Sequence, residues 1–173
     1  MSTSHKPFLM LAVLSGLAMA GCTTLRGLPN LQPGVATEAD ATALAGKPTY
    51  AWQNPDGTHT VEYSQQPGNG DIAYMVNVDA NGKVRKVDNM VVEENAKRIE
   101  RGMTHDQVRR IMGTPRRVIN YALSGEEVWD WNVPFEPRDE PRVRINAHFK
   151  DGTVIRTSQT EVQDCNRYTM TPC

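Results

Sequence analysis

Side chains that could carry out acid–base or metal chemistry are scattered along this sequence. Its four histidines show no metal-ligand spacing, and no serine lies in a nucleophile-elbow or Ser-x-x-Lys setting. Carboxylate pairs such as Glu126-Glu127 lack apolar surroundings that would raise a pKa. His105, just inside an expected helix start, is predicted to be solvated. The sequence therefore predicts a protein that is not an enzyme and holds no cofactor.

One segment imitates a metal-binding loop. Asn77 to Gly82, with Asp88 in the twelfth place, carries oxygen ligands at the positions of a calcium loop. Against a calcium site, alternating valines continue a strand pattern through this segment, and Asn81-Gly82 is a strong hairpin-turn signal. A hairpin is favoured, and no metal site is predicted.

Cys22 has the clearest predicted chemistry of the three cysteines. The uncharged, mostly apolar stretch from Pro7 to Ala20 is too short to span a bilayer but suits a signal peptide. A cysteine directly after small residues resembles the bacterial lipobox, in which the thiol is diacylated and becomes the new N-terminus. The alternative is an ordinary signal peptide cleaved beside a cysteine. Thr23 follows instead of an inner-membrane retention Asp, so the resemblance implies an outer-membrane lipoprotein facing the periplasm.

The other two cysteines, Cys165 and Cys173, form an even pair in the tail. In an oxidising compartment such a pair is expected to close a disulfide that fastens the tail. Zinc binding is the alternative, but two thiols with no nearby histidine fall short of a four-ligand site.

The charge of the chain limits its partners. A formal net charge of −1 leaves no electrostatic footprint for nucleic acid. Several acyl chains on Cys22, at about 0.8 kcal/mol per buried CH₂, would hold the protein on the membrane without a spanning helix.

The chain divides into five expected segments. These are a signal peptide (1–21), a tether (22–33), an N-terminal α+β unit (34–90), a second α+β unit (91–160) and a C-terminal tail (161–173).

A weak internal repeat relates the two units. Landmarks recur in constant order about 68 residues apart. The turn signal Gly46-Lys47-Pro48 recurs as Gly113-Thr114-Pro115, and the aromatic strand Val61 to Tyr63 recurs as Trp129 to Trp131. We therefore predict that the N-terminal unit is a degenerate copy of the second.

The second unit has the clearer pattern. Residues 91–99 predict a helix that ends at Gly102, where a hinge requires positive φ. Thr104 and Gln107 form a capping box for a second helix, which ends at Gly113. Strands are predicted over 117–121, 127–133, 143–149 and 153–158.

In the first unit, an Ala-rich helix over 36–45 contributes little apolar volume. It precedes strands over 49–53, 58–63, 72–78 and 83–87. The predicted fold is α+β, with short helices packed on antiparallel sheets.

Four motifs of the second unit resemble the BamE (SmpA/OmlA) lipoprotein family. They are Arg101 to Val108, Met112 to Pro115, Val128 to Trp131, and Phe149 to Val154. The resemblance covers residues 92–160 and implies a helical pair on a three-stranded antiparallel sheet. It also implies an accessory role in the machinery that assembles outer-membrane β-barrels. Residues 34–90 are an addition that small family members lack.

The function predicted is binding, with the partner surface around the hinge of the second unit, at Gly102, and the loop that follows Val133. Candidate contacts are Met103, Trp129, Phe135, Arg138 and Arg142, because aromatic and arginine side chains are frequent interface anchors. Trp129 and Trp131 share a strand face and form either core or an exposed aromatic platform.

Two function classes remain open. One is an assembly or scaffold lipoprotein that binds the outer-membrane β-barrel assembly machinery, with anionic phospholipid as a secondary contact. The other is an inhibitor-type module, because tandem units of this kind also resemble the β-lactamase inhibitor protein. Aromatic residues make up only 6% of the chain, so no rich aromatic paratope is evident.

Overall fold

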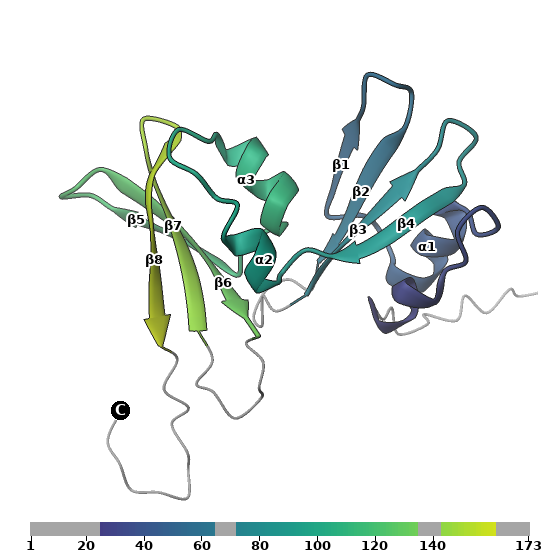
Figure 1. The fold of residues 1–173 in the computed structure, drawn as a ribbon, viewed down its shortest axis with the longest axis horizontal. Helices are drawn as coiled ribbons and strands as arrows, with labels where there is room; N and C mark the ends of the chain where they lie inside the picture. The colour runs from purple at the N-terminus through teal and green to yellow at the C-terminus, as the bar shows by residue number, and fades with distance from the viewer. Residues whose placement is uncertain (1–24, 65–71, 135–142, 162–173) are drawn as a thin grey trace, which may run out of the picture.

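The computed structural model describes residues 25–64, 72–134 and 143–161. They form two four-stranded antiparallel sheets, each with helices over one face, so the α+β prediction is confirmed (Figure 1). None of the helices described is both long and apolar enough to cross a membrane.

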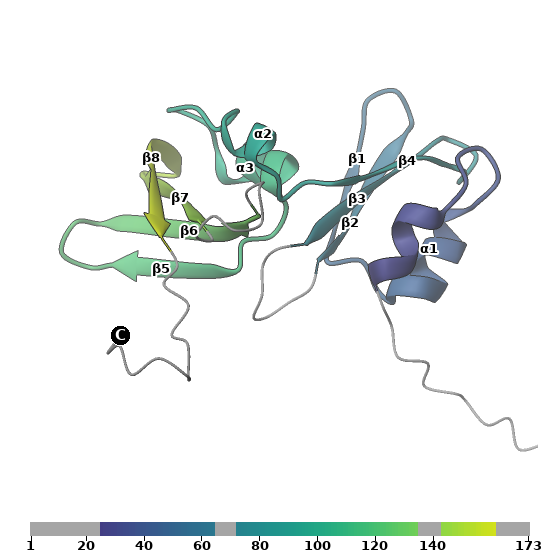
Figure 2. The same cartoon turned by 60° about the horizontal axis from the view of Figure 1, so that its bottom comes forward.

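The first unit is a meander of four strands with a helical layer on one face (Figure 2). Its core residues include Val61, Tyr63 and Val76, which lie under the helical layer. Its elements are η1 (Leu25–Asn30), α1 (Glu38–Ala45), β1 (Tyr50–Gln53), β2 (His59–Ser64), β3 (Ala73–Val78) and β4 (Val84–Asn89).

The helix α1 begins at a capping box that its sequence provides. The Thr37 hydroxyl accepts from the Asp40 N–H, and the Asp40 carboxylate accepts from the Thr37 N–H. Gly46 ends the helix with φ of 80°. Ala41 is its fully buried residue, in line with the small apolar volume expected of this helix.

The segment predicted as a tether is partly ordered, so that prediction is wrong for residues 25–30. They form the 3₁₀ helix η1, and Leu28 is completely buried in the core of the first unit. Glycine and proline had suggested a chain without structure, but burial of one leucine side chain contributes about 1.5–3 kcal/mol toward ordering it.

The second unit repeats this arrangement with its helices α2 and α3 over one sheet face. The predicted capping box of α3 is confirmed, with Thr104 and Gln107 exchanging hydrogen bonds. The helix predicted over 91–99 is shorter than expected and spans only Glu93–Ala96. The elements of the second unit are α2 (Glu93–Ala96), α3 (His105–Met112), β5 (Arg117–Tyr121), β6 (Glu126–Val133), β7 (Val143–Lys150) and β8 (Thr153–Glu161).

The sheet of the second unit has four strands where the family resemblance implied three. The sequence-predicted strand over 117–121 is present as β5 and pairs with β6. Trp129 and Trp131 are 6% and 0% exposed and lie in the core with α3, so the exposed-platform alternative is wrong.

The two units match in detail beyond strand order. In each, the residue that caps the helix forms a β-bridge where the last strand begins, Thr37 with Lys83 just before β4 and Thr104 with Thr153 at the first position of β8. Each last strand also carries a register shift against its neighbour. These correspondences support the predicted duplication, while the domain limits themselves stay a prediction.

Candidate partner-binding surface

The hinge between α2 and α3 has the backbone geometry that its sequence predicts. Gly102 has φ of 91°, the left-handed region in which other residues are strained. Its N–H donates to the Val154 carbonyl, and the Val154 N–H donates to the Met103 carbonyl, each at 2.8 Å. The hinge is therefore fixed to the start of β8.

Two of the predicted contact residues lie beneath this hinge. Met103 is half-buried and packs against the core, and its sulfur accepts from the Glu100 N–H at 3.4 Å. Trp129 is buried, and its indole N–H donates to Glu127 Oε1 at 2.6 Å. A partner at the hinge would meet the exposed backbone of Gly102 before either side chain.

The other predicted contact residues lie outside the described ranges. These are Phe135, Arg138 and Arg142. The cysteines predicted to be lipidated (Cys22) or paired in a disulfide (Cys165 and Cys173) also lie outside the described ranges. The loop holding the first three leaves β6 after Val133, which pairs with Val143, whereas the hinge contacts β8 opposite Phe149. The two points are six residue steps apart along β7, about 20 Å in an extended strand. Val133 and Val143, the described residues that flank this loop, thus lie at the end of the second sheet away from the hinge. The contacts at Phe135, Arg138 and Arg142 stay a prediction.

His105 is not the solvated side chain that its helix-start position suggested. Its ring stacks on Phe149, with centroids 4.0 Å apart, and Nε2 lies 2.8 Å from Glu127 Oε1. The ring therefore covers the aromatic core residues Trp129 and Phe149 at the start of α3.

A contact between the two units was not visible in the sequence. Trp52 of β1 donates its indole N–H to Asp106 Oδ1 of α3 at 2.6 Å, across 54 positions of sequence. Arg110 lies over the Trp52 ring at 4.9 Å and pairs with Asp106 at 2.9 Å. Arg109 lies between the Tyr50 and Trp129 rings. Helix α3 is thus held by both sheets.

The C-terminal end of α3 makes the second half of this contact. Glu62 of β2 is completely buried, and its Oε1 accepts from the Thr114 N–H at 2.6 Å. Gly113 lies so close to β3 that an added Cβ would come nearer than 3.0 Å to the Cβ of Ala73. We call the contacts of α3 with Trp52, Glu62 and Ala73 the inter-unit contact.

Trp52→Phe is expected to weaken the inter-unit contact in a pH-dependent way. The indole hydrogen bond, followed by Arg110, holds the pKa of Asp106 below its usual 3.8, although partial burial opposes the shift. Because the folded pKa is depressed, this contribution is present above about pH 4 and is lost as pH falls through the folded pKa. The difference in free energy of unfolding between wild type and Trp52→Phe should therefore shrink at low pH. We expect a change of only about 1 kcal/mol, because Asp106 is half exposed and solvent screens its charge.

Chemical denaturation between pH 2.5 and pH 7 measures this difference. Asp106→Asn is the matched control, because it keeps an oxygen acceptor but removes the ionisable group. In the Asp106→Asn background, the effect of Trp52→Phe should no longer depend on pH. An unchanged pH profile in the single Trp52→Phe variant would contradict the described bond.

The face of the second sheet opposite its helices carries a hydrogen-bonded polar row. His148 contacts Glu126 Oε2 through Nδ1 and Ser158 Oγ through Nε2, each at 2.9 Å, and the His148 contact lowers the pKa of Glu126. A carboxylate, a histidine and a serine are linked in this order in the catalytic triad of serine hydrolases. However, the Arg156 guanidinium also lies 3.1 Å from Nε2, so it competes with Ser158 for the same lone pair. The row is better described as a polar surface network.

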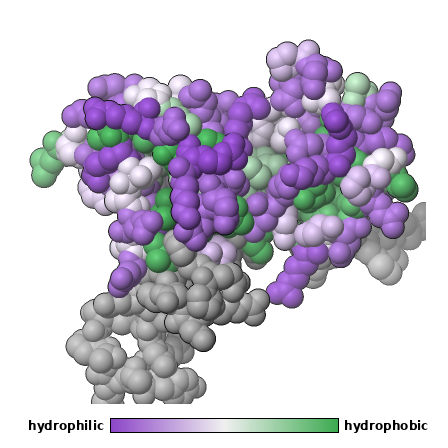
Figure 3. All heavy atoms as spheres, viewed as in Figure 1, coloured by the Kyte–Doolittle hydropathy of each residue, from purple (hydrophilic) through white to green (hydrophobic). Residues whose placement is uncertain are grey.

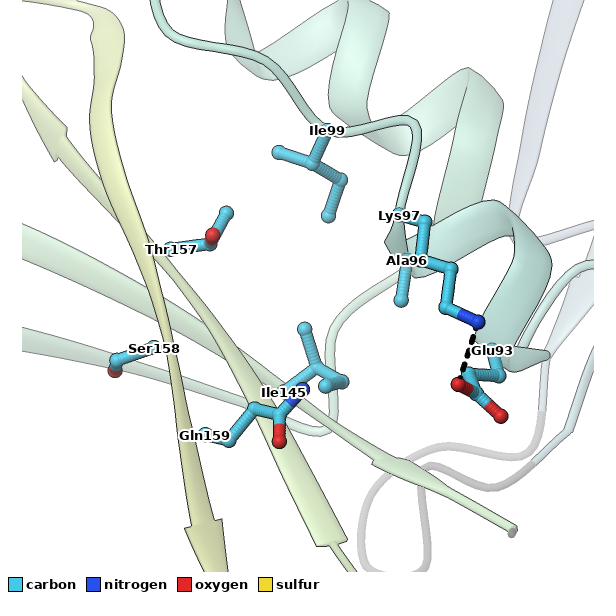
Figure 4. Close-up of a pocket in the computed structure, with 8 residues that line it drawn as sticks. All are labelled: Glu93, Ala96, Lys97, Ile99, Ile145, Thr157, Ser158 and Gln159. Atoms are coloured by element: carbon cyan, nitrogen blue, oxygen red, sulfur yellow. Dashed lines mark ion pairs between the residues drawn. The ribbon is translucent and has the colours of Figure 1, made fainter. Parts of the chain in front are cut away.

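A hollow of about 330 Å³ lies on the face of the second sheet that carries the helices, between β8 and α2 (Figure 4). Ala96, Ile99 and Ile145 point into it, while the Ser158 side chain points away. A Lys97–Glu93 ion pair of 2.6 Å borders it. The hollow is therefore apolar at its floor and polar at its rim. Among the residues that the structure describes, no three His, Cys, Asp or Glu side chains gather as metal ligands.

Exposed apolar side chains of the second unit gather on the β5–β6 hairpin. Val118, Tyr121 and Leu123 are 45%, 50% and 107% exposed. Figure 3 shows a hydrophobic tip at this hairpin on an otherwise largely hydrophilic face.

Comparison with known proteins matches the second unit to one family. Residues 88–159 match the family model described as the outer membrane protein assembly factor BamE domain. No curated protein sequence matches the chain. The crystal structure of a proposed β-lactamase inhibitor protein from Streptococcus mutans aligns with 72% of this chain and 82% of its own, at 14% identity and a TM-score of 0.33. A TM-score of this size supports no inference about function.

Proposed function

We propose, on the premise that residues 88–159 form a BamE-type domain, that this protein is an outer-membrane lipoprotein. In this proposal it acts as a non-enzymatic assembly factor. The observation that carries the proposal is the match of this family to the second unit, whose hinge, capped α3 and aromatic core are all formed. The expected lipid anchor at Cys22 would place the domain on the periplasmic face of the outer membrane.

The proposed partner is the outer-membrane β-barrel assembly machinery. Contacts are proposed at the loop residues Phe135, Arg138 and Arg142, with anionic lipid head groups as a secondary contact for the arginines. We propose that the second unit provides these contacts while the first unit holds α3 at both of its ends.

The first unit changes which surface of the BamE-type domain is free. Asp106 and Gly113 lie at the two ends of α3, and both face the first sheet. We therefore propose that a partner approaches the hinge, the loop or the outer sheet face, and not the side of α3 that the first sheet contacts.

Crosslinking in the native envelope, followed by identification of the trapped proteins, tests this function. Wild-type protein is expected to capture components of the assembly machinery. The double variant Phe135→Ala/Arg138→Ala should lower that capture several-fold while the free energy of unfolding stays within about 1 kcal/mol, as is usual for surface changes.

Leu123→Ala is the matched control, because it removes an exposed apolar side chain at the opposite end of the sheet. It should leave capture unchanged. If the double variant unfolds the protein, Phe135 belongs to the core. If wild-type protein captures no assembly component, the family role does not extend to this longer chain.

A further inference from the structure

The outer edge of β8 is closed at its beginning and open further along. β8 is the last strand of its sheet, and the hinge pairs with it through Gly102 and Met103 at Val154. Within residues 25–64, 72–134 and 143–161, no backbone group bonds to this edge beyond Val154. The hinge residues Gly102 and Met103 thus pair with the first part of this edge, as an additional strand would, but within the described residues the chain does not continue along the rest of it.

The strand register identifies which backbone groups face this open edge. Because the N–H and C=O of Val154 bond to the hinge, they point away from its β7 partner, Phe149. On β7, Ala147 and Ile145 follow at two-residue intervals, and they pair with Thr157 and Gln159. In an antiparallel ladder the pattern repeats every second residue. The backbone groups of Thr157 and Gln159 therefore also point outward.

The hollow between α2 and β8 lies directly beside these two residues. Thr157 and Gln159 line it together with the apolar side chains Ala96, Ile99 and Ile145 (Figure 4). Its volume of about 330 Å³ is several times the roughly 30 Å³ of one liquid water, so it can admit a branched aliphatic side chain. Strand addition uses this combination of edge hydrogen bonds and pockets for alternate side chains.

The two faces beside the open edge differ in chemistry. The hollow has an apolar floor, whereas the opposite face carries Asn146, His148 and Ser158 in a hydrogen-bonded network. A strand lying along β8 would therefore place alternate side chains against apolar and polar surroundings. Strands of membrane β-barrels have this alternation over about 9–11 residues, and the open part of β8, residues 155–161, would pair with part of such a strand.

We propose that the open edge of β8 binds an extended segment with alternating apolar and polar side chains, of the kind from which membrane β-barrels are built. One apolar side chain of the segment enters the hollow, and its backbone pairs with Thr157 and Gln159. This inference rests on the proposed role in outer-membrane assembly and specifies the class of partner at one site.

The test uses the full-length protein in lipid nanodiscs and a fluorescent ten-residue peptide that alternates leucine or valine with serine or threonine. Fluorescence anisotropy should show saturable binding above that of empty nanodiscs. Gln159→Pro removes one outward N–H and leaves the bonds to β7, so it should weaken binding at least tenfold. The matched variant Gln159→Ala keeps the N–H and should stay within twofold.

Two peptide controls keep the test decisive if Gln159→Pro fails to fold. A peptide of the same composition without alternation, and one N-methylated on alternate residues, should each bind wild-type protein at least tenfold more weakly. Equal binding of all three peptides would overturn the proposal.

A photo-crosslinking residue at Thr157 identifies the occupant of the edge. Adducts to the alternating peptide support the proposal, whereas adducts only to residues 162–173 or to a second copy overturn it. Envelope capture of the assembly machinery is read separately. Capture without peptide binding would refute only this site, and peptide binding without capture would refute the proposed function.

Discussion

Gly113→Ala is expected to lower the free energy of unfolding by roughly 2–6 kcal/mol. Gly113 ends α3 at φ of 73° and ψ of −170°, a backbone region that is essentially restricted to glycine and costs other residues about 1–3 kcal/mol. The added Cβ would also overlap the Cβ of Ala73, which belongs to the other unit. Overpacking of this kind costs about 1–3 kcal/mol more.

Two controls separate strain from overlap in this experiment. Gly102→Ala has a similar positive φ of 91° with no atom within 4 Å of the added Cβ, so it should show strain alone. In a double-mutant cycle, Ala73→Gly should restore about 1–2 kcal/mol to Gly113→Ala, because the overlap is relieved. If denaturant unfolding shows equal losses for Gly113→Ala and Gly102→Ala, the close approach of α3 to β3 is wrong.

Cys22→Ser is expected to release the protein from the membrane fraction. Serine carries no thiol for acylation, and stable anchoring requires more than one buried acyl chain. Membrane fractionation combined with mass spectrometry of the N-terminal peptide should show a soluble or uncleaved species instead of a lipidated one. The expected loss of the lipidated species is close to complete, because the substitution removes the thiol that is acylated.

Cys165→Ser is the matched control, since it also removes one thiol but lies in the predicted disulfide pair. It should remain in the outer-membrane fraction. The anchor assignment is wrong if Cys22→Ser fractionates with the outer membrane as the wild type does.

Local sequence signals predicted most of the second unit because each acts over a few residues. Thr104 and Gln107 are three positions apart, and their capping box fixes the start of α3 in the structure as in the sequence. Gly102 marks a positive φ, and the alternation from Val143 to Phe149 marks a strand, although the structure buries Asn146 and His148 on its second face as well. Signals of this range depend little on the rest of the fold.

The inter-unit contact could not be predicted in the same way. Strand alternation places Glu62 opposite the core residues Val61 and Tyr63, which ordinarily means a solvated face. The structure buries that face under the end of α3, where Thr114 donates to Glu62. Trp52 and Asp106 are likewise 54 positions apart, and only the folded chain brings them together.

The grip of the first sheet on both ends of α3 also determines how the protein would carry mechanical load. Tension between η1 (Leu25–Asn30) and a partner held by the second unit has two routes, the main chain from Asn89 to Glu93 and the lateral contacts of α3. The side-chain contacts would yield before any covalent bond. The two units would then separate while each sheet stays folded, so the proposed lipid anchor and the proposed partner would be joined by an extensible connection.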